Sequence, residues 1–253
     1  MGQLLDRVMQ RHAWRFWRKA ARDAANTPLS TLRGQLNQAR HLRQHLDQIV
    51  HVAEGRLALP QIGSSAFPKP HGTDWSWRPE LWRGPLATPG LSSVQTKARL
   101  GHEVQMFHDC AESEISLRQL RNSRESDLAP FGLRMDVFKF DGSFLSLVVD
   151  LPADAARGLS KHHLIRVNSL VESEEPIEIF ARLNIQHGPN TEQLVRELSS
   201  SQKDQMVEFD LAYSRLNEKR IEKLWLDLIF EAPDLNQVVL RDLTLLRLPR
   251  AAL

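Results

Sequence analysis

The sequence is poor in cysteine, in long apolar runs and in metal-ligand motifs, and each shortage excludes a class of protein. Cys110 is the only cysteine among 253 residues, so no disulfide can form within the chain and a reducing compartment is expected. No apolar run approaches the roughly 20 residues that cross a bilayer, and arginine interrupts the N-terminal segment where a signal peptide would be apolar. We therefore expect a cytoplasmic protein that can lie peripherally at the inner membrane.

The ten histidines do not follow the spacing of a zinc site. His162 and His163 are adjacent, so on a strand they point to opposite faces. His108 and Cys110 would share one face of a strand, but no third group that orients them is identified. The sequence therefore predicts no metal, no cofactor and no catalytic residue.

Charge divides the chain into two unequal parts. Residues 1–56 carry a net charge of +6, whereas the whole chain carries +2, so the remaining residues carry −4. Such an asymmetry indicates that the two parts face different partners. We expect three segments: a basic helical arm at 1–56, an ordered connector rich in Trp and Pro at 57–99, and a β domain at 100–253.

The arm has the 3.6-residue period of amphipathic helices. On a helix over 4–25, apolar side chains occupy one arc and five arginines the opposite arc: Arg7, Arg11, Arg15, Arg18 and Arg22. Thr27 and Pro28 predict a break and a second helix start, and Gly55 predicts its end. The second helix repeats apolar residues close to a heptad pattern: Leu29, Leu32, Leu36, Ala39, Leu42, Leu46, Ile49 and Ala53.

Two interpretations of the arm stay open. In the first, the helices pack as an αα-hairpin or across the β domain, and the arginines form a solvated face. In the second, the arm docks on an anionic membrane surface or an acidic protein, with Trp14, Phe16 and Trp17 as an interfacial anchor. Nucleic acid is the weakest candidate partner, because the chain has no recognised binding motif and its larger part is acidic.

The connector combines many Pro and Gly residues with three tryptophans, Trp75, Trp77 and Trp82. A flexible linker would be poor in tryptophan, so we expect an extended, ordered segment that buries its indoles in the β domain. In the alternative, the loop binds a ligand, since indoles stack on sugar rings and nearby polar groups donate and accept hydrogen bonds. The candidate binding residues of this loop are His71, Asp74, Trp75 and Trp77.

From about residue 100 the apolar period becomes two, which is typical of strands. The expected strands are 104–109, 115–121, 132–140, 143–151, 164–171, 176–187, 192–198, 206–213, 221–231 and 237–248. Short connections without intervening helices predict an antiparallel β-sandwich resembling a jelly roll, behind the N-terminal α-helical hairpin arm.

Alternation within the strands predicts which residues face the core. The predicted core faces are Ile177 to Ile185, Val207 to Tyr213 and Leu224 to Phe230, each at alternate positions. Asp141-Gly142 predicts a tight hairpin between 132–140 and 143–151. Both faces of that hairpin are partly apolar, so we expect the arm or the connector to cover one of them.

The outward positions of the same strands supply the second set of candidate binding residues. They combine an indole with planar polar groups, as a sugar-binding sheet does, or they form an ordinary solvated face. The candidates are Arg182, Asn184, Gln186, Asp210, Trp225 and Asp227, with Glu208 beside them.

Several stretches resemble an uncharacterised protein family from alphaproteobacteria: 71–82 (HGTDWSWRPELW), 131–150 (FGLRMDVFKFDGSFLSLVVD), 187–192 (HGPNTE) and 228–247 (LIFEAPDLNQVVLRDLTLLR). That family has no assigned activity and so implies no catalytic residue. The tail at 228–247 also resembles the last two strands of jelly-roll carbohydrate-binding modules, which implies a β-sandwich that binds saccharides.

These observations together predict a non-catalytic binding protein that recognises a glycan or small saccharide, in envelope polysaccharide handling. One alternative is an adaptor that docks on a protein or a membrane surface through the basic arm. A second alternative is a glycoside-active hydrolase that uses outward carboxylates such as Glu208 and Asp210.

Overall fold

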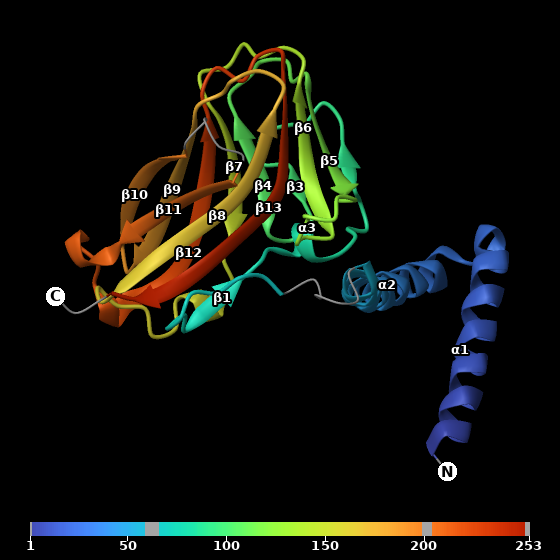
Figure 1. The fold of residues 1–253 in the computed structure, drawn as a ribbon. Coiled ribbons are helices and arrows are strands. Elements are labelled where there is room, and N and C mark those ends of the chain that lie inside the picture. Colours follow the sequence, from blue (N-terminus) through green and yellow to red (C-terminus); the bar gives the residue numbers. More distant parts are fainter. Residues whose placement is uncertain (1, 59–65, 199–203, 251–253) are drawn as a thin grey trace. The chain divides into compact units, whose positions relative to one another are not determined.

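The computed structural model in Figure 1 describes residues 2–58, 66–198 and 204–250. The chain divides into two units, Met1–Ile49 and Val50–Leu253. The first unit is helical, and the second contains all the described strands. The predicted connector at 57–99 includes residues 59–65, which lie outside the described residues.

Two long helices form the N-terminal part, α1 (Gly2–Asp23) and α2 (Leu29–Ala58), with a short 3-10 turn, η1 (Ala24–Asn26), after α1. The helix break is where the sequence predicts it, but Thr27 does not cap the second helix. Its Oγ1 donates instead to the carbonyl oxygen of Asp23 at 2.9 Å and satisfies a free acceptor at the end of α1. The predicted stop at Gly55 is wrong, because α2 continues through it to Ala58.

The second unit is a sandwich of two antiparallel sheets (Figure 1), which confirms the predicted fold class. The six-stranded sheet has the order β10 (Asn190–Leu198), β9 (Ile179–His187), β12 (Ile221–Phe230), β7 (Leu145–Asp150), β4 (Val104–His108) and β3 (Arg99–Leu100). The seven-stranded sheet has the order β11 (Asp204–Asp210), β8 (His163–Ser173), β13 (Asn236–Pro249), β6 (Phe131–Val137), β5 (Ile115–Arg121) and β2 (Gly90–Leu91), and β1 (Trp75–Trp77) pairs with β13.

The chain crosses repeatedly between the sheets, in the manner of a jelly roll. The predicted Asp141-Gly142 hairpin is therefore wrong: β6 pairs with β5 and β13, whereas β7 pairs with β4 and β12 in the other sheet. Side chains from other loops hold this crossing segment by its backbone. Asp109 accepts from the Ser143 amide at 2.7 Å, and Asp234 accepts from the Phe140 amide at 2.7 Å.

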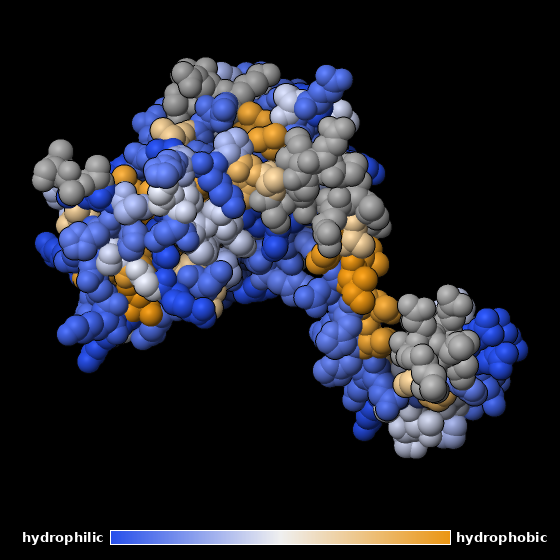
Figure 2. Space-filling view, turned by 60° about the horizontal axis from the view of Figure 1, so that its bottom comes forward, coloured by the Kyte–Doolittle hydropathy of each residue, from blue (hydrophilic) through white to orange (hydrophobic). Residues whose placement is uncertain are grey.

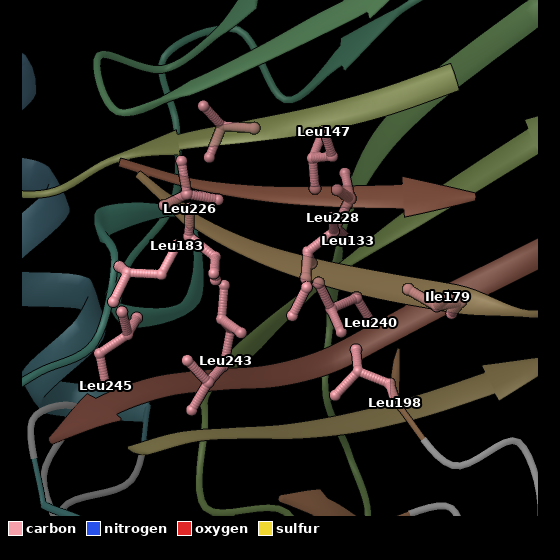
Figure 3. Packing of buried hydrophobic residues seen from close by; sticks show 14 of the residues in the cluster. Leu133, Leu147, Ile179, Leu183, Leu198, Leu226, Leu228, Leu240, Leu243 and Leu245 are labelled. Carbon is pink, nitrogen blue, oxygen red and sulfur yellow. The ribbon is translucent and has the colours of Figure 1, made fainter. Parts of the chain in front are cut away.

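Aliphatic side chains from the inner faces of both sheets fill the core (Figure 3). The predicted inward residues of β9 and β12 are buried, and these are Ile179, Ala181, Leu183, Ile185, Leu224, Leu226, Leu228 and Phe230. Tyr213 is an exception, with 82% of its surface exposed. The strand ends at Asp210 and the 3-10 turn η3 (Leu211–Tyr213) follows, so the alternation of the strand no longer applies.

The described part of the connector closes one end of the sandwich. β1 extends the seven-stranded sheet by pairing with the last residues of β13, and the short helix α3 (Glu80–Arg83) follows it. Leu81 and Trp82 are fully buried in the main core, and the Trp82 indole donates to the carbonyl oxygen of Leu240 at 2.9 Å. Trp75 and Trp77 also pack against the core while remaining partly exposed.

Candidate functional site

A groove with a volume of about 630 Å³ runs over the outward face of the six-stranded sheet. Four central strands and one edge strand supply most of its lining, which is Arg99, Gln105, Phe107, Phe144, Ser146, Val148, Asp150, Arg182, Gln186, Lys223, Trp225, Asp227 and Ile229. On β7, β9 and β12 the lining residues alternate with buried core residues, so the strand period of two places them on one surface.

Strand register brings the predicted residues of β9 and β12 side by side. Asp227 lies opposite Arg182 on one neighbouring strand and opposite Val148 on the other. Trp225 lies opposite Asn184 and Asp150 in the same way. Directly opposite residues have Cβ atoms about 5 Å apart, so these rows form one continuous surface across three strands.

The apolar part of the groove is aromatic. Trp225, Phe107 and Phe144 line it together with Ile229, and the Lys223 ammonium lies 5.7 Å from the centroid of the Trp225 ring. Trp225 is only partly buried, so part of its surface is open to a ligand. Large aromatic faces at a groove surface offer stacking area at little conformational cost.

A hydrogen-bonded network joins the polar groups of the floor. Asp227 Oδ2 accepts from Arg182, whose Nη2 lies 2.6 Å away, and from Asn184 Nδ2 at 3.0 Å. The Asn184 amide oxygen accepts in turn from Gln193 Nε2 at 2.9 Å. Asn184 is fully buried, so it positions Asp227 and does not itself present a surface.

Two buried oxygens of the groove residues have no hydrogen-bond partner among the described residues, Asp227 Oδ1 and Ser146 Oγ. Both residues line the groove and are less than one tenth exposed. A buried polar atom without a partner costs roughly 1–3 kcal/mol, so such atoms are usually satisfied by water or by a ligand.

The charged groups of the groove are paired within the protein. Asp150 lies 2.8 Å from Lys223 Nζ and 3.8 Å from Arg99 Nη1, and Asp227 is bound by Arg182. Each carboxylate thus has a basic partner, and three basic side chains against two carboxylates leave the groove with a net charge of +1.

The other predicted binding residues lie apart from the groove. Asp210 is on β11 in the seven-stranded sheet, where it caps η3 and lies 3.2 Å from Arg250 Nε. Glu208 is on the same strand and binds Arg166 at 2.7 Å. The expectation that these two carboxylates share a sheet surface with Trp225 is therefore wrong, because β11 and β12 belong to different sheets.

The tryptophan loop also lies outside the groove. The Trp75 and Trp77 rings stack with centroids 6.4 Å apart and pack against the core, opposite Arg247 and Leu245 of β13. Asp74 lies 2.9 Å from Arg247 Nε and 3.3 Å from His163 Nε2, which anchors the loop to the sandwich. His71 is exposed at its start. These contacts give Asp74 and both indoles a structural role.

Sequence reasoning did not assign the residues of β4 and β7 to the site, although one signal was present. The arm or the connector is expected to cover one of the two partly apolar faces of 132–151, and Phe144 and Val148, which belong to one of these faces, line the groove. The outward apolar residues of 143–151 were therefore the sequence signal for this groove, since an outward apolar face is either covered or binds a ligand.

Metal binding and membrane spanning receive no support within the described ranges. No group of three or more His, Cys, Asp or Glu side chains there could hold a metal ion. In their described residues, neither α1 nor α2 is apolar enough to cross a membrane.

Several solved structures similar to this chain are carbohydrate-binding modules. The family 11 module from Clostridium thermocellum, in complex with a β-1,3-1,4-mixed-linked tetrasaccharide, covers 64% of this chain and 97% of its own, with 13% identity and a TM-score of 0.40. A xylan-binding domain from Paenibacillus barcinonensis covers 73% of this chain and 100% of its own, with 11% identity and a TM-score of 0.39.

A third similar structure is the enzymatically active domain of a tailspike protein from bacteriophage CBA120. It covers 56% of this chain and 19% of its own, with 2% identity and a TM-score of 0.40. At such TM-scores the description of the fold rests on the strand order given above.

No curated protein matches the sequence. One family model does, and it spans residues 1–253. This match agrees with the uncharacterised family expected from stretches such as 71–82. The chain therefore belongs to DUF6478, a family of unknown function.

Proposed function

We propose that this protein binds a neutral saccharide in the groove of the six-stranded sheet and has no catalytic activity there. The observation that carries the proposal is the placement of Trp225 beside two buried oxygens without partners, Asp227 Oδ1 and Ser146 Oγ, in one groove of about 630 Å³. This volume lies within the range of about 300–1,000 Å³ that is usual for small-molecule sites.

The chemistry of a saccharide matches both halves of the groove. A sugar ring has an apolar C–H face that stacks on an indole, and its hydroxyl groups donate to carboxylate and hydroxyl oxygens. Gln186 and Gln105 add neutral amides that can donate to and accept from hydroxyls. Since Asp150 and Asp227 are already paired with basic side chains, a neutral sugar suits the groove better than a cationic one.

A glycan array with the full-length protein tests the proposal, followed by calorimetric titration of the ligands found. We expect millimolar to micromolar binding of neutral oligosaccharides. Binding only of sulfated or uronic-acid glycans would contradict the assignment of a neutral ligand, and no binding to any glycan would overturn the proposal.

Variants locate the binding site. Trp225→Ala removes the stacking surface and is expected to weaken binding at least tenfold, or about 1.4 kcal/mol. Trp14→Ala removes an indole of the same size from α1, where 74% of its surface is exposed, and should leave binding unchanged. Equal losses of saccharide binding for the two variants would show that the saccharide does not bind in the groove.

The similar solved structures do not add an argument at TM-scores of 0.40 and below, so the groove alone supports the proposal. A role in envelope polysaccharide handling, at the cytoplasmic side of the inner membrane, is the biological setting that we propose for such binding.

A second candidate function concerns α1, the docking of the protein on an anionic membrane surface. Met9 and Phe16, on the apolar arc of the helix, are 68% and 53% exposed. On the opposite arc, Arg11, Arg15, Arg18 and Arg22 make no ion pair in the part of the chain that the structure describes. The side chain of Arg7 lies outside the described residues. Exposed apolar and basic faces on one helix are typical of segments that lie in a bilayer interface.

Co-sedimentation with vesicles of phosphatidylcholine, with and without phosphatidylglycerol, tests this second function. We expect binding to the anionic vesicles only, weakened by salt, by Phe16→Ser and by Arg11/Arg15/Arg18→Ala. Arg118/Arg121/Lys219→Ala removes the same charge from exposed positions of the sandwich and should bind as the wild type does. Equal binding to neutral vesicles, or equal losses for both triple variants, would exclude the arm as the anionic contact.

A further inference from the structure

The second helix presents a long apolar stripe to solvent that the saccharide groove does not explain. α2 has 30 residues, which is about 45 Å of helix. Leu36, Leu42 and Leu46 are 47%, 39% and 51% exposed, and Ile49 is exposed as well. Figure 2 shows apolar side chains at the surface of the helical part, next to hydrophilic ones. Monomeric proteins rarely leave an apolar surface of this kind uncovered.

The stripe follows a heptad pattern, abcdefg, in which a and d positions form the contact of a coiled coil. Position a is taken by Leu29, Leu36 and Arg43, position d by Leu32, Ala39 and Leu46, and position g by Leu42 and Ile49. All these positions are exposed or only half-buried in the single chain. The stripe is therefore available to a partner helix along its whole length.

We propose that α2 of a second copy of this chain covers the stripe, as an antiparallel two-helix coiled coil. In an antiparallel pair, each a residue lies beside a d residue of the other helix. With the two-fold axis near residue 41, Leu36 meets Leu46 of the second copy, and Arg43 meets Ala39. Leu42 meets Leu42 of the second copy close to the axis.

The pairing around Arg43 favours this orientation. In a parallel pair in register, Arg43 would face Arg43 of the second copy within the apolar contact, which brings two like charges together. In the antiparallel pair, the long side chain of Arg43 lies over the small Ala39. Its apolar stem then covers the contact while its guanidinium reaches water.

Charges beside the contact also match between the two copies. Arg33, Arg40 and Asp47 occupy position e, and in the antiparallel pair the e positions of the two helices face each other. Arg33 then lies beside Asp47 of the second copy, and symmetry repeats this pair. Within one chain, Asp47 Oδ2 is 3.7 Å from Arg43 Nε, so it already lies on this side of the helix. Arg40 faces Arg40 across the axis, which is the one unfavourable pair.

Sedimentation equilibrium of the full chain tests the proposal. We expect a dimer at micromolar concentration, and a dissociation constant at least 100-fold higher for Leu36→Asp/Leu46→Asp, because each removes large apolar contacts. Asn37→Asp/Gln44→Asp adds the same charges to the same helix at b positions, outside the stripe, and should remain dimeric. The wild type as a monomer at 100 µM, or a dimer that persists in the leucine variant, would overturn the proposal.

Cross-linking determines the orientation. In a Cys110→Ser background, Leu42→Cys should be joined by a short bismaleimide, because residue 42 lies near the axis. Leu29→Cys should not be joined, since the two copies of residue 29 lie 24 positions apart, or about 36 Å. Cross-linking of both variants would indicate a parallel dimer, and cross-linking of neither would exclude the helix contact. Thermal unfolding of each variant confirms that the sandwich stays folded.

Discussion

The two sheets of the sandwich have the same alternation of inward and outward residues, yet their outward faces differ in kind. The six-stranded sheet carries aromatic and amide side chains around a groove of about 630 Å³. Both faces carry ion pairs, Arg182 with Asp227 in the groove and Arg166 with Glu208 on the seven-stranded sheet, but the aromatic surface is that of the groove. The period of two decides only which residues point outward, while their chemistry decides whether that face binds a ligand or stabilises the domain.

The outward face of the seven-stranded sheet also has a hollow, which the connector helps to line. Phe67, Pro68 and Pro70 of the connector line a cavity of about 450 Å³ there, together with Asp242 and Thr244 of β13. The Arg78 guanidinium lies 4.9 Å from the Phe67 ring centroid and 2.7 Å from Asp242 Oδ2. These contacts hold the connector on the seven-stranded face, whereas Trp225, Phe107 and Phe144 leave an aromatic surface in the groove.

The largest expected effect comes from breaking the buried ion pair of the seven-stranded face. Asp242→Ala removes the carboxylate that binds the fully buried Arg78 and should lower the free energy of unfolding by about 4 kcal/mol. Urea denaturation measures this loss. Asp210→Ala removes the partner of the partly exposed Arg250 from the same sheet and should cost less than about 1 kcal/mol. Similar losses of unfolding free energy for both variants would show that the burial of an ion pair does not determine how much it stabilises the fold.

Glu103, which precedes β4 of the six-stranded sheet, should make stability fall as pH rises. Burial, together with the nearby Glu80, raises the pKa of Glu103 to about 7 from 4.5. The folded chain therefore binds more protons than the unfolded chain between these values, and stability decreases as pH rises from about 4.5 to 7. The Glu103 side chain is 22% exposed, so solvent screens part of this effect. We expect the free energy of unfolding to fall by about 2 kcal/mol across this pH range.

Glu103→Gln removes this titration while keeping an oxygen that can accept from the Glu80 amide. Between pH 4 and pH 8, the free energy of unfolding of the variant should rise by about 2 kcal/mol relative to the wild type. Urea denaturation at both pH values measures the change. A constant difference between the two proteins would show that Glu103 does not titrate in this window.

Glu172, on the seven-stranded face, should show the opposite pH dependence. Hydrogen bonds from Arg124 and Arg241 lower the pKa of Glu172 to about 2 from 4.5. Its contribution to stability is present above about pH 4.5 and is lost as pH falls through about 2. Glu172→Gln should therefore cost about 1 kcal/mol at pH 7, and the cost should shrink by pH 3. An equal loss of unfolding free energy at pH 7 and pH 3 would show that Glu172→Gln acts through packing and not through the charge of Glu172.

The smallest expected effect on stability belongs to the groove. Trp225→Ala should lower the free energy of unfolding by no more than about 1 kcal/mol, because Trp225 is only partly buried and lies outside the core. A loss near 4 kcal/mol in urea denaturation would place Trp225 among the structural residues. The outward face of the six-stranded sheet would then contribute to stability as the seven-stranded face does.

The sequence predicted much of the β domain because each strand carries its own signal. β5 begins and ends at the predicted residues, and the inward residues of β9 and β12 alternate as expected. The hairpin predicted at Asp141-Gly142 does not form, since a turn dipeptide specifies a local bend but not which sheet each flanking strand joins. For the site, Arg182, Gln186, Trp225 and Asp227 were predicted and lie together, whereas the contribution of β4 and β7 was not foreseen.

By itself, the sequence determined most of the long helices and strands and which side of most strands is apolar, because these depend on neighbours along the chain. Only the tertiary structure decided that β11 and β12 lie in different sheets, which separates Asp210 from Trp225. It also decided that the connector tryptophans pack on the core while Trp225 borders an open groove. Strand order depends on contacts between residues far apart in sequence, and a single sequence does not record those contacts.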